Sequence, residues 1–347
     1  MPFRSVVAAG ALLLSSLAGS AWAQAPQTPS SPALATTEGG PVIDIAGHQV
    51  PVAAGGLYDR YRSNPPLAVV QAEAPGLDLS WFKELKKVKV DIGFESYSPN
   101  FYYKNSRVTV VYTADLARLR ELMPAKVLEQ VQPLQVWPGR GLVALTAYSY
   151  EYCDNDSYNE VAVSIVTSKL GGSNWGPFSL LAQSMAKDLS GYVLKLPVNT
   201  ELARVRGVVG YNLPKWLTPI NLKDGEKSLT FEILDAKTGK PDVVLEARKL
   251  EGLSKDVELV TNRFTNVDQA GRLTHGHSVS RQLSHASSTD SGAVKLTLQA
   301  GGSLSTFIQS LKLGKMMRYE YVPEFQLALY APELVKTGAG QERSEER

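Results

Sequence analysis

The sequence predicts an α+β protein in which a β-rich antiparallel barrel or sandwich, with a central cavity, carries a few short helices. Runs of β-branched and aromatic residues recur about every 10–15 residues through the second half of the chain, as in antiparallel assemblies. Segments with helical spacing are few and short. Strands and helices do not alternate regularly, which disfavours a doubly wound parallel sheet.

The chain of 347 residues begins with a pattern typical of a secretory signal peptide. Arg4 supplies a basic start, residues 6–18 form a short apolar core, and Ala21-Trp22-Ala23 matches a cleavage site. This core is shorter than the roughly 20 apolar residues that a transmembrane helix needs. We therefore expect residues 1–23 to be removed, and the mature protein to be secreted or periplasmic with no membrane anchor.

The segments that follow differ in composition. Residues 24–40 are rich in Pro, Ser and Thr, and we expect a disordered leader because they bury too little apolar surface to offset their ordering entropy. Residues 41–100 contain short apolar runs separated by turns, and they are expected to form an N-terminal extension packed on the main domain. That domain is expected to span residues 101–335, and residues 336–347 to form a charged, frayed tail.

The first elements of the main domain are well marked. Residues 107–112 (RVTVVY) predict a strand. Leucines at helical spacing in residues 115–123 predict a short helix, which Thr113 or Asp115 caps and Pro124 ends. Further strands are predicted at 142–150, 161–166, 192–196, 228–234, 243–250, 257–264, 275–283, 294–299 and 319–329. Two further short helices are predicted at 200–206 and 303–311, and a turn at 154–156.

Charge and cysteine content exclude several classes of protein. There are 36 Lys and Arg against 34 Asp and Glu, so the net charge is +2, and no basic stripe interleaved with aromatic residues indicates a nucleic-acid partner. The single cysteine, Cys153, excludes an internal disulfide framework. We expect a small-molecule ligand or substrate as the partner, no nucleic acid and no membrane, and the sequence is compatible with a homo-oligomer.

The segment around Lys215 contains the strongest candidate for chemistry. Pro214 fixes the backbone immediately before Lys215, and Leu213, Trp216 and Leu217 surround the lysine with apolar side chains. Burial disfavours an ammonium and lowers its pKa, and a neutral amine attacks a carbonyl to form a Schiff base. The alternative from the residues alone is a surface lysine whose stem covers apolar surface while its charge stays in water.

This segment resembles the signature of the acetoacetate decarboxylase family. Gly207 stands seven positions before Pro214, which is the family's spacing, and Pro214-Lys215 corresponds to the Pro-Lys that carries the Schiff-base lysine. Other stretches follow in the family's order. They are residues 110–124, similar to a strand and an Asp-x-x-x-Leu-x-x-x-x-Pro helix; residues 157–163, similar to a strand with Tyr-x-Glu; and residues 319–325, similar to the closing strand.

The resemblance covers residues 100–332 and implies a mechanism. Lys215 would form a Schiff base with a small oxo acid, and Glu160 would act beside it as general acid or base in decarboxylation or related aldol-type chemistry. The implied substrate-binding residues are Trp216, Arg107, Tyr148 and Tyr211. No cofactor and no metal is implied. Even with the resemblance, Glu160 is equally well explained as a solvated carboxylate at a strand edge.

The sequence also departs from the family's pattern. Val208 and Val209 replace an Arg-Glu pair, Trp216 replaces a second lysine, and a further family carboxylate falls at Ala144. The family's substrate-binding arginine falls at Asn105. These differences keep a second function open, an exported protein that binds an apolar metabolite on the same fold without turnover.

Two other groups of polar residues point to no site. His275 and His277 share one face of a predicted strand, and His285 follows, but no acidic ligand completes a metal-binding set. Residues 154–156 offer oxygen ligands without the glycine and spacing of an EF-hand, so a plain turn is the better interpretation.

Overall fold

The structure is a computed structural model that describes residues 40–336. The expected signal peptide, the leader as far as residue 39 and the tail beyond residue 336 lie outside the described residues. In the described part, no helix combines the length and the apolar character that a bilayer span requires.

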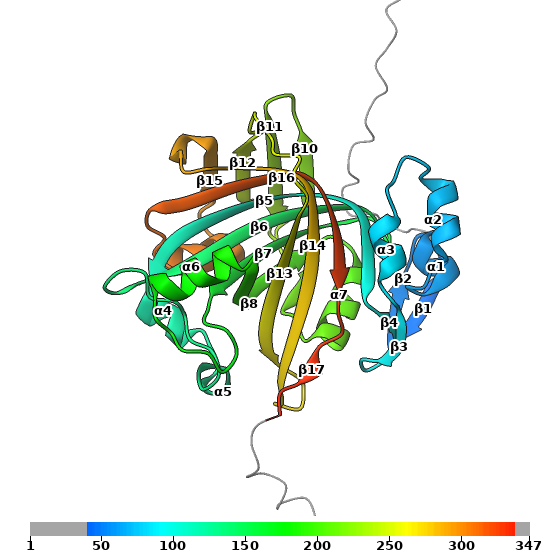
Figure 1. Ribbon diagram of the computed structural model, residues 1–347, viewed down its shortest axis with the longest axis horizontal. Helices are drawn as coiled ribbons and strands as arrows, with labels where there is room; N and C mark the ends of the chain where they lie inside the picture. Colours follow the sequence, from blue (N-terminus) through cyan, green and yellow to red (C-terminus); the bar gives the residue numbers. More distant parts are fainter. Residues whose placement is uncertain (1–39, 337–347) are drawn as a thin grey trace, which may run out of the picture. The chain divides into compact units, whose positions relative to one another are not determined.

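A closed barrel of seven strands forms the body of the protein (Figure 1). In ring order the strands are β13 (Glu258–Val267), β14 (Leu273–Ser288), β16 (Met316–Leu329), β5 (Asn100–Asp115), β6 (Arg140–Cys153), β7 (Tyr158–Val166) and β8 (Asp188–Val198). Register shifts in the pairing of β5 with β16 bend these long strands, and such bulges let a sheet curve until it closes. The predicted β-rich α+β class is confirmed.

Two pairings of β8 depart from the expected antiparallel arrangement. β8 pairs in parallel with β13, which closes the barrel, and with the short strand β9 (Lys215–Leu217). A parallel neighbour requires a crossover connection, and here the chain passes from β8 to β9 through α7 (Glu201–Val205) and a π-helical turn, η1 (Arg206–Gly210). This crossover contains the Gly207-to-Lys215 segment.

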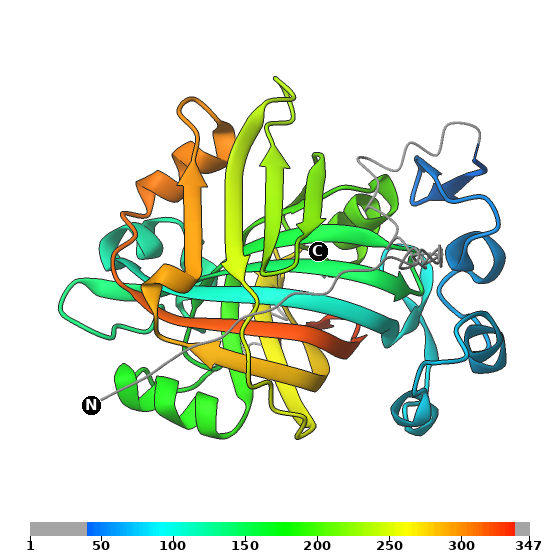
Figure 2. The same ribbon diagram turned by 90° about the horizontal axis from the view of Figure 1, so that it is seen from above.

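A second sheet covers the outer face of the barrel. Its strands are β10 (Ile220–Asp224), β11 (Ser228–Leu234), β12 (Pro241–Arg248) and β15 (Val294–Leu298), and they run across the direction of the barrel strands (Figure 2). The largest apolar cluster lies between the two layers and includes Val108, Ala147 and Val161 of the barrel with Phe231 and Leu245 of the sheet. Because strand side chains alternate, Arg107, Tyr148 and Glu160 face the barrel interior instead.

Residues 42–98 form two hairpins with three short helices between them. The elements are β1 (Val42–Ile45), β2 (His48–Pro51), α1 (Leu57–Tyr61), α2 (Leu67–Glu73), α3 (Ser80–Glu84), β3 (Val88–Asp91) and β4 (Glu95–Ser98). Phe82 of α3 packs on Phe101 and Tyr103 of β5, with ring centroids 4.8 and 5.0 Å apart. Segment 81–90, where the sequence mixes helix and strand character, thus contains the end of a helix and the start of a strand.

The remaining elements are short. They are α4 (Leu116–Glu121), α5 (Ala125–Leu128), α6 (Pro177–Met185), the 3-10 turn η2 (Ser291–Ala293), α8 (Ser303–Ser310) and β17 (Glu333–Leu334). Asp115 caps α4 by accepting a hydrogen bond from Arg118 N at 2.9 Å, as predicted, and Thr200 caps α7 through Ala203 N at 3.3 Å. Helix α6 has no counterpart among the predicted elements, because its one buried residue is the polar Gln183 and its large apolar side chains are exposed.

Candidate active site

The crossover between β8 and β9 folds back on itself and brings Lys215 against Gly207. Leu213 N donates a hydrogen bond to Gly207 O at 3.0 Å, and Asn212 takes a positive φ of 55° to make the turn. A Cβ at position 207 would overlap the Cδ and Cε atoms of Lys215. Position 207 therefore has to be glycine for the Lys215 side chain to lie where it does. This contact gives the Gly207-to-Pro214 spacing a physical meaning.

Lys215 ends in a buried pair with Glu160. Its Nζ lies 2.6 Å from Glu160 Oε2, and the two side chains are only 7% and 8% exposed. The lysine comes from β9 and the glutamate from β7, with β8 between them. The barrel therefore withdraws both members of this ion pair from water.

Pairing of the barrel strands places two further polar side chains beside Glu160. Arg107 on β5 lies opposite Tyr148 on β6, and Tyr148 lies opposite Glu160 on β7. Cross-strand partners share one face of a sheet, so these three side chains form a row on the interior wall. Arg107 Nη2 is 2.8 Å from Glu320 Oε2, and Nη1 is 3.3 Å from Ser280 Oγ.

Arg107 and Glu320 form an ion pair in the barrel interior. Burial acts to raise the pKa of the Glu320 carboxyl, but the charge and the hydrogen bond of Arg107 outweigh it and leave this pKa below its ordinary value. The guanidinium also lies over the Phe325 ring, 5.3 Å from its centroid. Arg107 therefore already has an anionic partner.

An aromatic cluster surrounds the lysine–glutamate pair. Tyr158 places its ring 5.4 Å from Lys215 Nζ, and Tyr150 donates its hydroxyl to Glu160 Oε1 at 3.4 Å, which is a long hydrogen bond. Tyr148 stacks on Tyr150 with ring centroids 5.3 Å apart, and the Tyr102 hydroxyl is 3.1 Å from that of Tyr158. Burial raises the pKa of all four tyrosines, so they stay neutral hydrogen-bonding groups.

The structure brings the predicted site residues together only in part. Lys215, Glu160, Tyr148 and Arg107 lie on the interior face. Trp216, the next residue along β9, faces the opposite way and packs against the cluster between barrel and outer sheet. Tyr211 is buried next to Leu196 and Leu213, and its hydroxyl has no hydrogen-bond partner within residues 40–336. Direct substrate contact by Trp216, Arg107, Tyr148 and Tyr211 stays a prediction.

Sequence reasoning missed the aromatic and backbone components of the site. Tyr102, Tyr150 and Tyr158 lie on three different strands, and only the alternation of tyrosines at 148, 150 and 152 indicated an aromatic face. The spacing of Gly207 and Pro214 is consistent with the contact of Gly207 with Lys215, but the spacing alone does not reveal that contact. Neither the alternation of tyrosines nor the spacing of the glycine specifies which strands are neighbours in the barrel.

A buried cation ties the N-terminal extension to this segment. Arg206, directly before Gly207, is 2% exposed and has no carboxylate oxygen within 4.0 Å among the described residues. Its guanidinium donates to Tyr58 Oη at 3.3 Å, Ser96 Oγ at 3.1 Å and Asn100 Oδ1 at 3.2 Å. Because Tyr58 and Ser96 belong to the extension, residues 42–98 support the turn on which Lys215 packs.

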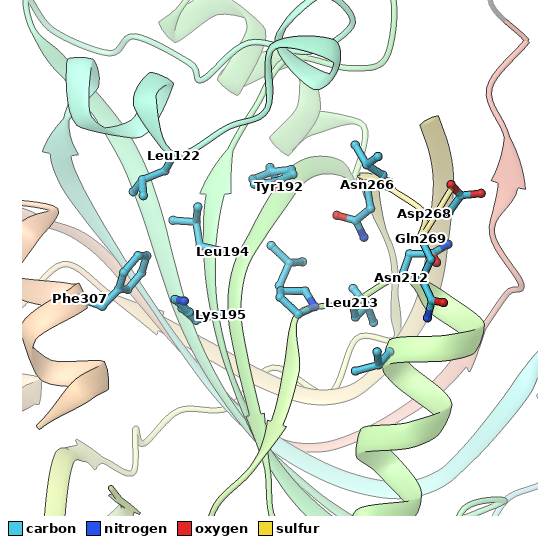
Figure 3. Close-up of a pocket in the computed structure, with 14 residues that line it drawn as sticks. Leu122, Tyr192, Leu194, Lys195, Asn212, Leu213, Asn266, Asp268, Gln269 and Phe307 are labelled. Carbon is cyan, nitrogen blue, oxygen red and sulfur yellow. The ribbon is translucent and has the colours of Figure 1, made fainter. Parts of the chain in front are cut away.

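A cavity of about 420 Å³ adjoins the site without including it. Leu213 and Pro214 line the cavity, whereas Lys215 and Glu160 do not (Figure 3). This cavity is therefore not the central one that the sequence predicts around Lys215, where tyrosine rings pack around the pair. The histidines predicted to share a strand face serve other contacts: His275 Nδ1 lies 3.0 Å from Thr265 Oγ1, and His277 stacks on Tyr330. Within residues 40–336 no His, Cys, Asp and Glu cluster suited to a metal was found.

No protein-family model matches the chain, and no curated protein sequence matches it. Among solved structures, it is similar to acetoacetate decarboxylase from Legionella pneumophila, with 12% identity and a TM-score of 0.48, over 69% of this chain and 87% of that one. It is also similar to the enduracididine biosynthesis enzyme MppR complexed with pyruvate, with 13% identity and a TM-score of 0.48, over 69% and 91%. A third similar structure is an acetoacetate decarboxylase-like enzyme from Sphingomonas wittichii RW1, with 14% identity and a TM-score of 0.40, over 69% and 94%. These similarities concern the arrangement of the chain only.

Proposed function

We propose that the protein is an enzyme that forms a Schiff base between Lys215 and a small oxo acid. The observation that carries the proposal is the buried pair of Lys215 Nζ and Glu160 Oε2, 2.6 Å apart. Schiff-base formation needs an amine that can lose its proton and an acid that can return it, and the pair supplies both. The class of substrate follows from the sequence resemblance around Pro214-Lys215.

The protons that Lys215 and Glu160 exchange with the substrate balance from the first addition to the iminium. The Lys215 ammonium transfers a proton to Glu160, and the neutral amine adds to the substrate carbonyl to give a carbinolamine. The protonated Glu160 returns that proton to the carbinolamine hydroxyl, which leaves as water. The products are a protonated iminium on Lys215 and an ionised Glu160, which holds the new positive charge.

The iminium then serves as an electron sink. If the substrate carries a carboxylate β to the carbonyl, its carbon–carbon bond breaks, CO2 leaves, and the electron pair forms an enamine with the iminium. Protonation of the enamine carbon and hydrolysis release the product and restore Lys215. Loss of a proton from the α carbon instead of CO2 also gives an enamine, which keeps the substrate's carboxylate and opens aldol-type reactions.

Borohydride trapping tests the proposal. The protein is incubated with acetoacetate, pyruvate and other small oxo acids, reduced, and mapped by mass spectrometry. We expect a reduced adduct on Lys215 and none in Lys215→Met. Lys223→Met is the matched control, because Lys223 lies in β10 and is exposed. A panel that gives no adduct on Lys215, with the protein folded, contradicts the proposal.

One observation favours the second candidate, a binding protein without turnover. Apolar side chains, among them Leu194, Leu213 and Pro214, line part of the cavity of about 420 Å³, and Lys215 is not among its lining residues. In that case, trapping fails with every oxo acid while apolar ligands still raise the melting temperature. The two functions thus give opposite results in one pair of experiments.

We further propose that the protein acts outside the cytosol. The pattern of residues 1–23 supports export, since it combines a basic start, a short apolar core and a small-residue cleavage site. N-terminal sequencing of the mature protein tests this, and a chain that begins at Gln24 is the expected result. A mature chain that keeps Arg4 contradicts it.

A further inference from the structure

The barrel wall has a break between β8 and β13. Pairing of these strands ends at Gly191 and Phe264, and pairing of β8 with β9 begins only at Leu196. Residues 192–195 therefore have a strand neighbour on the β7 side but none on the other side within the described chain. The cavity of about 420 Å³ occupies this break, and that volume is in the range of small-molecule sites.

Lys195 supplies a cation without an anionic partner at this break. Within residues 40–336, no carboxylate oxygen lies within 4.0 Å of its Nζ. The ammonium lies over the faces of two aromatic rings, 4.9 Å from the centroid of Phe307 and 6.0 Å from that of Trp216. Such contacts hold the charge in place but leave its three N–H donors available to a ligand in the cavity.

The polar groups on the opposite side of the cavity do not compete for this cation. Figure 3 shows Lys195 and Phe307 on one side, and Asn266, Asp268 and Gln269 on the other. The Asp268 carboxylate already accepts hydrogen bonds from Ala270 N, Arg272 N and Arg272 Nε. Asn266 Nδ2 is a buried donor with no partner in the described part of the chain. Lys195 Nζ and Asn266 Nδ2 are therefore two donors on these walls that an acceptor group of a ligand can use.

Apolar side chains form a further part of the cavity wall. Between the two polar sides lie Leu122, Tyr192, Leu194, Leu213 and Pro214. These side chains favour an apolar body, and the unpaired ammonium favours an acidic group at one end. We propose that the cavity is a binding site for a small carboxylate with an apolar body, whose carboxylate pairs with Lys195.

Octanoate is the probe, and 1-octanol is its uncharged analogue. The dissociation constants of both are measured by isothermal titration calorimetry on the intact protein, Lys195→Met and Lys223→Met. We expect Lys195→Met to raise the octanoate constant about tenfold or more, because a charge-assisted hydrogen bond is lost. Octanol binding should change less than about twofold in all three proteins, since it depends on the apolar walls.

Several outcomes overturn the proposal. They are no octanoate binding at 10 mM, equal loss of affinity in Lys223→Met, or an octanoate constant in Lys195→Met within about twofold of that of the unchanged protein. Lys195→Gln serves as a second variant that keeps a polar end, in case the methionine variant does not fold.

The test is independent of the proposed enzyme activity, because octanoate has no ketone and forms no Schiff base. Lys215→Met should bind octanoate as the unchanged protein does. If Lys215→Met weakens octanoate binding as much as Lys195→Met, the ligand occupies the barrel interior and the proposed site is wrong. Failure of the oxo acids to form an adduct leaves the octanoate result unaffected.

Discussion

Two buried lysine–carboxylate pairs in this protein contain the same chemical groups but differ in how fully those groups are satisfied. In the first pair, Lys87 joins the N-terminal extension to the barrel at Asp154, with Nζ and Oδ2 2.5 Å apart. Asp154 also accepts hydrogen bonds from Phe101 N at 2.6 Å and Tyr103 Oη at 2.7 Å. Lys87 donates a second bond to Ser63 O at 2.8 Å. Replacement of either Lys87 or Asp154 by an apolar residue would leave a buried polar group without a hydrogen-bond partner.

In the second pair, Lys215 and Glu160 make fewer hydrogen bonds than their atoms allow. Glu160 has one other contact in the described residues, the long 3.4 Å bond from Tyr150, and Lys215 Nζ makes no second hydrogen bond there. If a proton moved within this pair, or if the lysine formed a new covalent bond, few neighbouring groups would lose a hydrogen-bond partner. Hydrogen-bonding capacity, more than burial, thus distinguishes this pair from that of Lys87 and Asp154, and it fits the reactive role proposed for Lys215.

Glu160→Gln should show the largest effect and sharpen this comparison. The amide still accepts a hydrogen bond from Lys215 but cannot take or return its proton. We expect the rate of the borohydride-trapped adduct to fall about 10²- to 10⁴-fold, which is the typical contribution of general acid–base catalysis. Glu246→Gln, on the exposed face of β12, is the control and should leave the rate unchanged. A Glu160→Gln rate within about threefold of the original removes Glu160 from the mechanism.

Asp154→Asn should show the reverse pattern. The substitution leaves Lys87 buried without its counter-charge and weakens the bonds from Phe101 N and Tyr103 Oη, and breaking a buried pair in this way typically costs about 3–5 kcal/mol. Urea unfolding measures this loss, with the exposed Asp256→Asn as control. The adduct rate per folded molecule should stay within about twofold. A large loss of rate with unchanged stability breaks the distinction between the two pairs.

Asp156 tests the same region through pH. Burial raises the pKa of its carboxyl from 3.8 to about 6, because the desolvation outweighs the backbone hydrogen bonds from α1 and the positive charge of Arg60. Between these two values the folded protein binds more protons than the unfolded chain, so the free energy of unfolding falls as pH rises through about 6. We expect this decline to reach up to about 3 kcal/mol.

Asp156→Asn removes the titrating group and so should remove this decline. The stability difference between Asp156→Asn and the unchanged protein, measured by urea unfolding, should be smallest below about pH 3.8, grow as the pH rises from there, and level off above about pH 6. Equal pH dependence in the two proteins contradicts the assignment.

Gly207→Ala should show the smallest effect, confined to the Lys215 region. The added Cβ overlaps the aliphatic part of Lys215, and accommodating it costs about 1–2 kcal/mol. Because Lys215 has to shift from Glu160, we expect the adduct rate to fall about tenfold. Gly76→Ala is the matched control, since a Cβ there meets no atom within 4 Å. If both variants keep the original rate, Gly207 has no role in positioning the lysine.

Local sequence features determined much of the fold. The central parts of the barrel strands, the cap at Asp115 and the turn after Cys153 all lie where the residues predicted them. Strand lengths were underestimated: residues 107–112 are the middle of a 16-residue strand, β5. Bulges and the consecutive polar residues 104–107 interrupt the alternation of polar and apolar side chains in β5, although the backbone pairing continues.

For the site, the sequence by itself determined the residue types and the spacing of Gly207, Pro214 and Lys215, because a tight turn and a close backbone contact depend on neighbouring residues. Only the tertiary structure decided that Lys215 meets Glu160, 55 positions away, while Trp216 turns to the outer layer. It also decided that Arg107 is already paired with Glu320. Register and barrel closure set these contacts. Both arise from packing across the whole sheet, which no short stretch of sequence specifies.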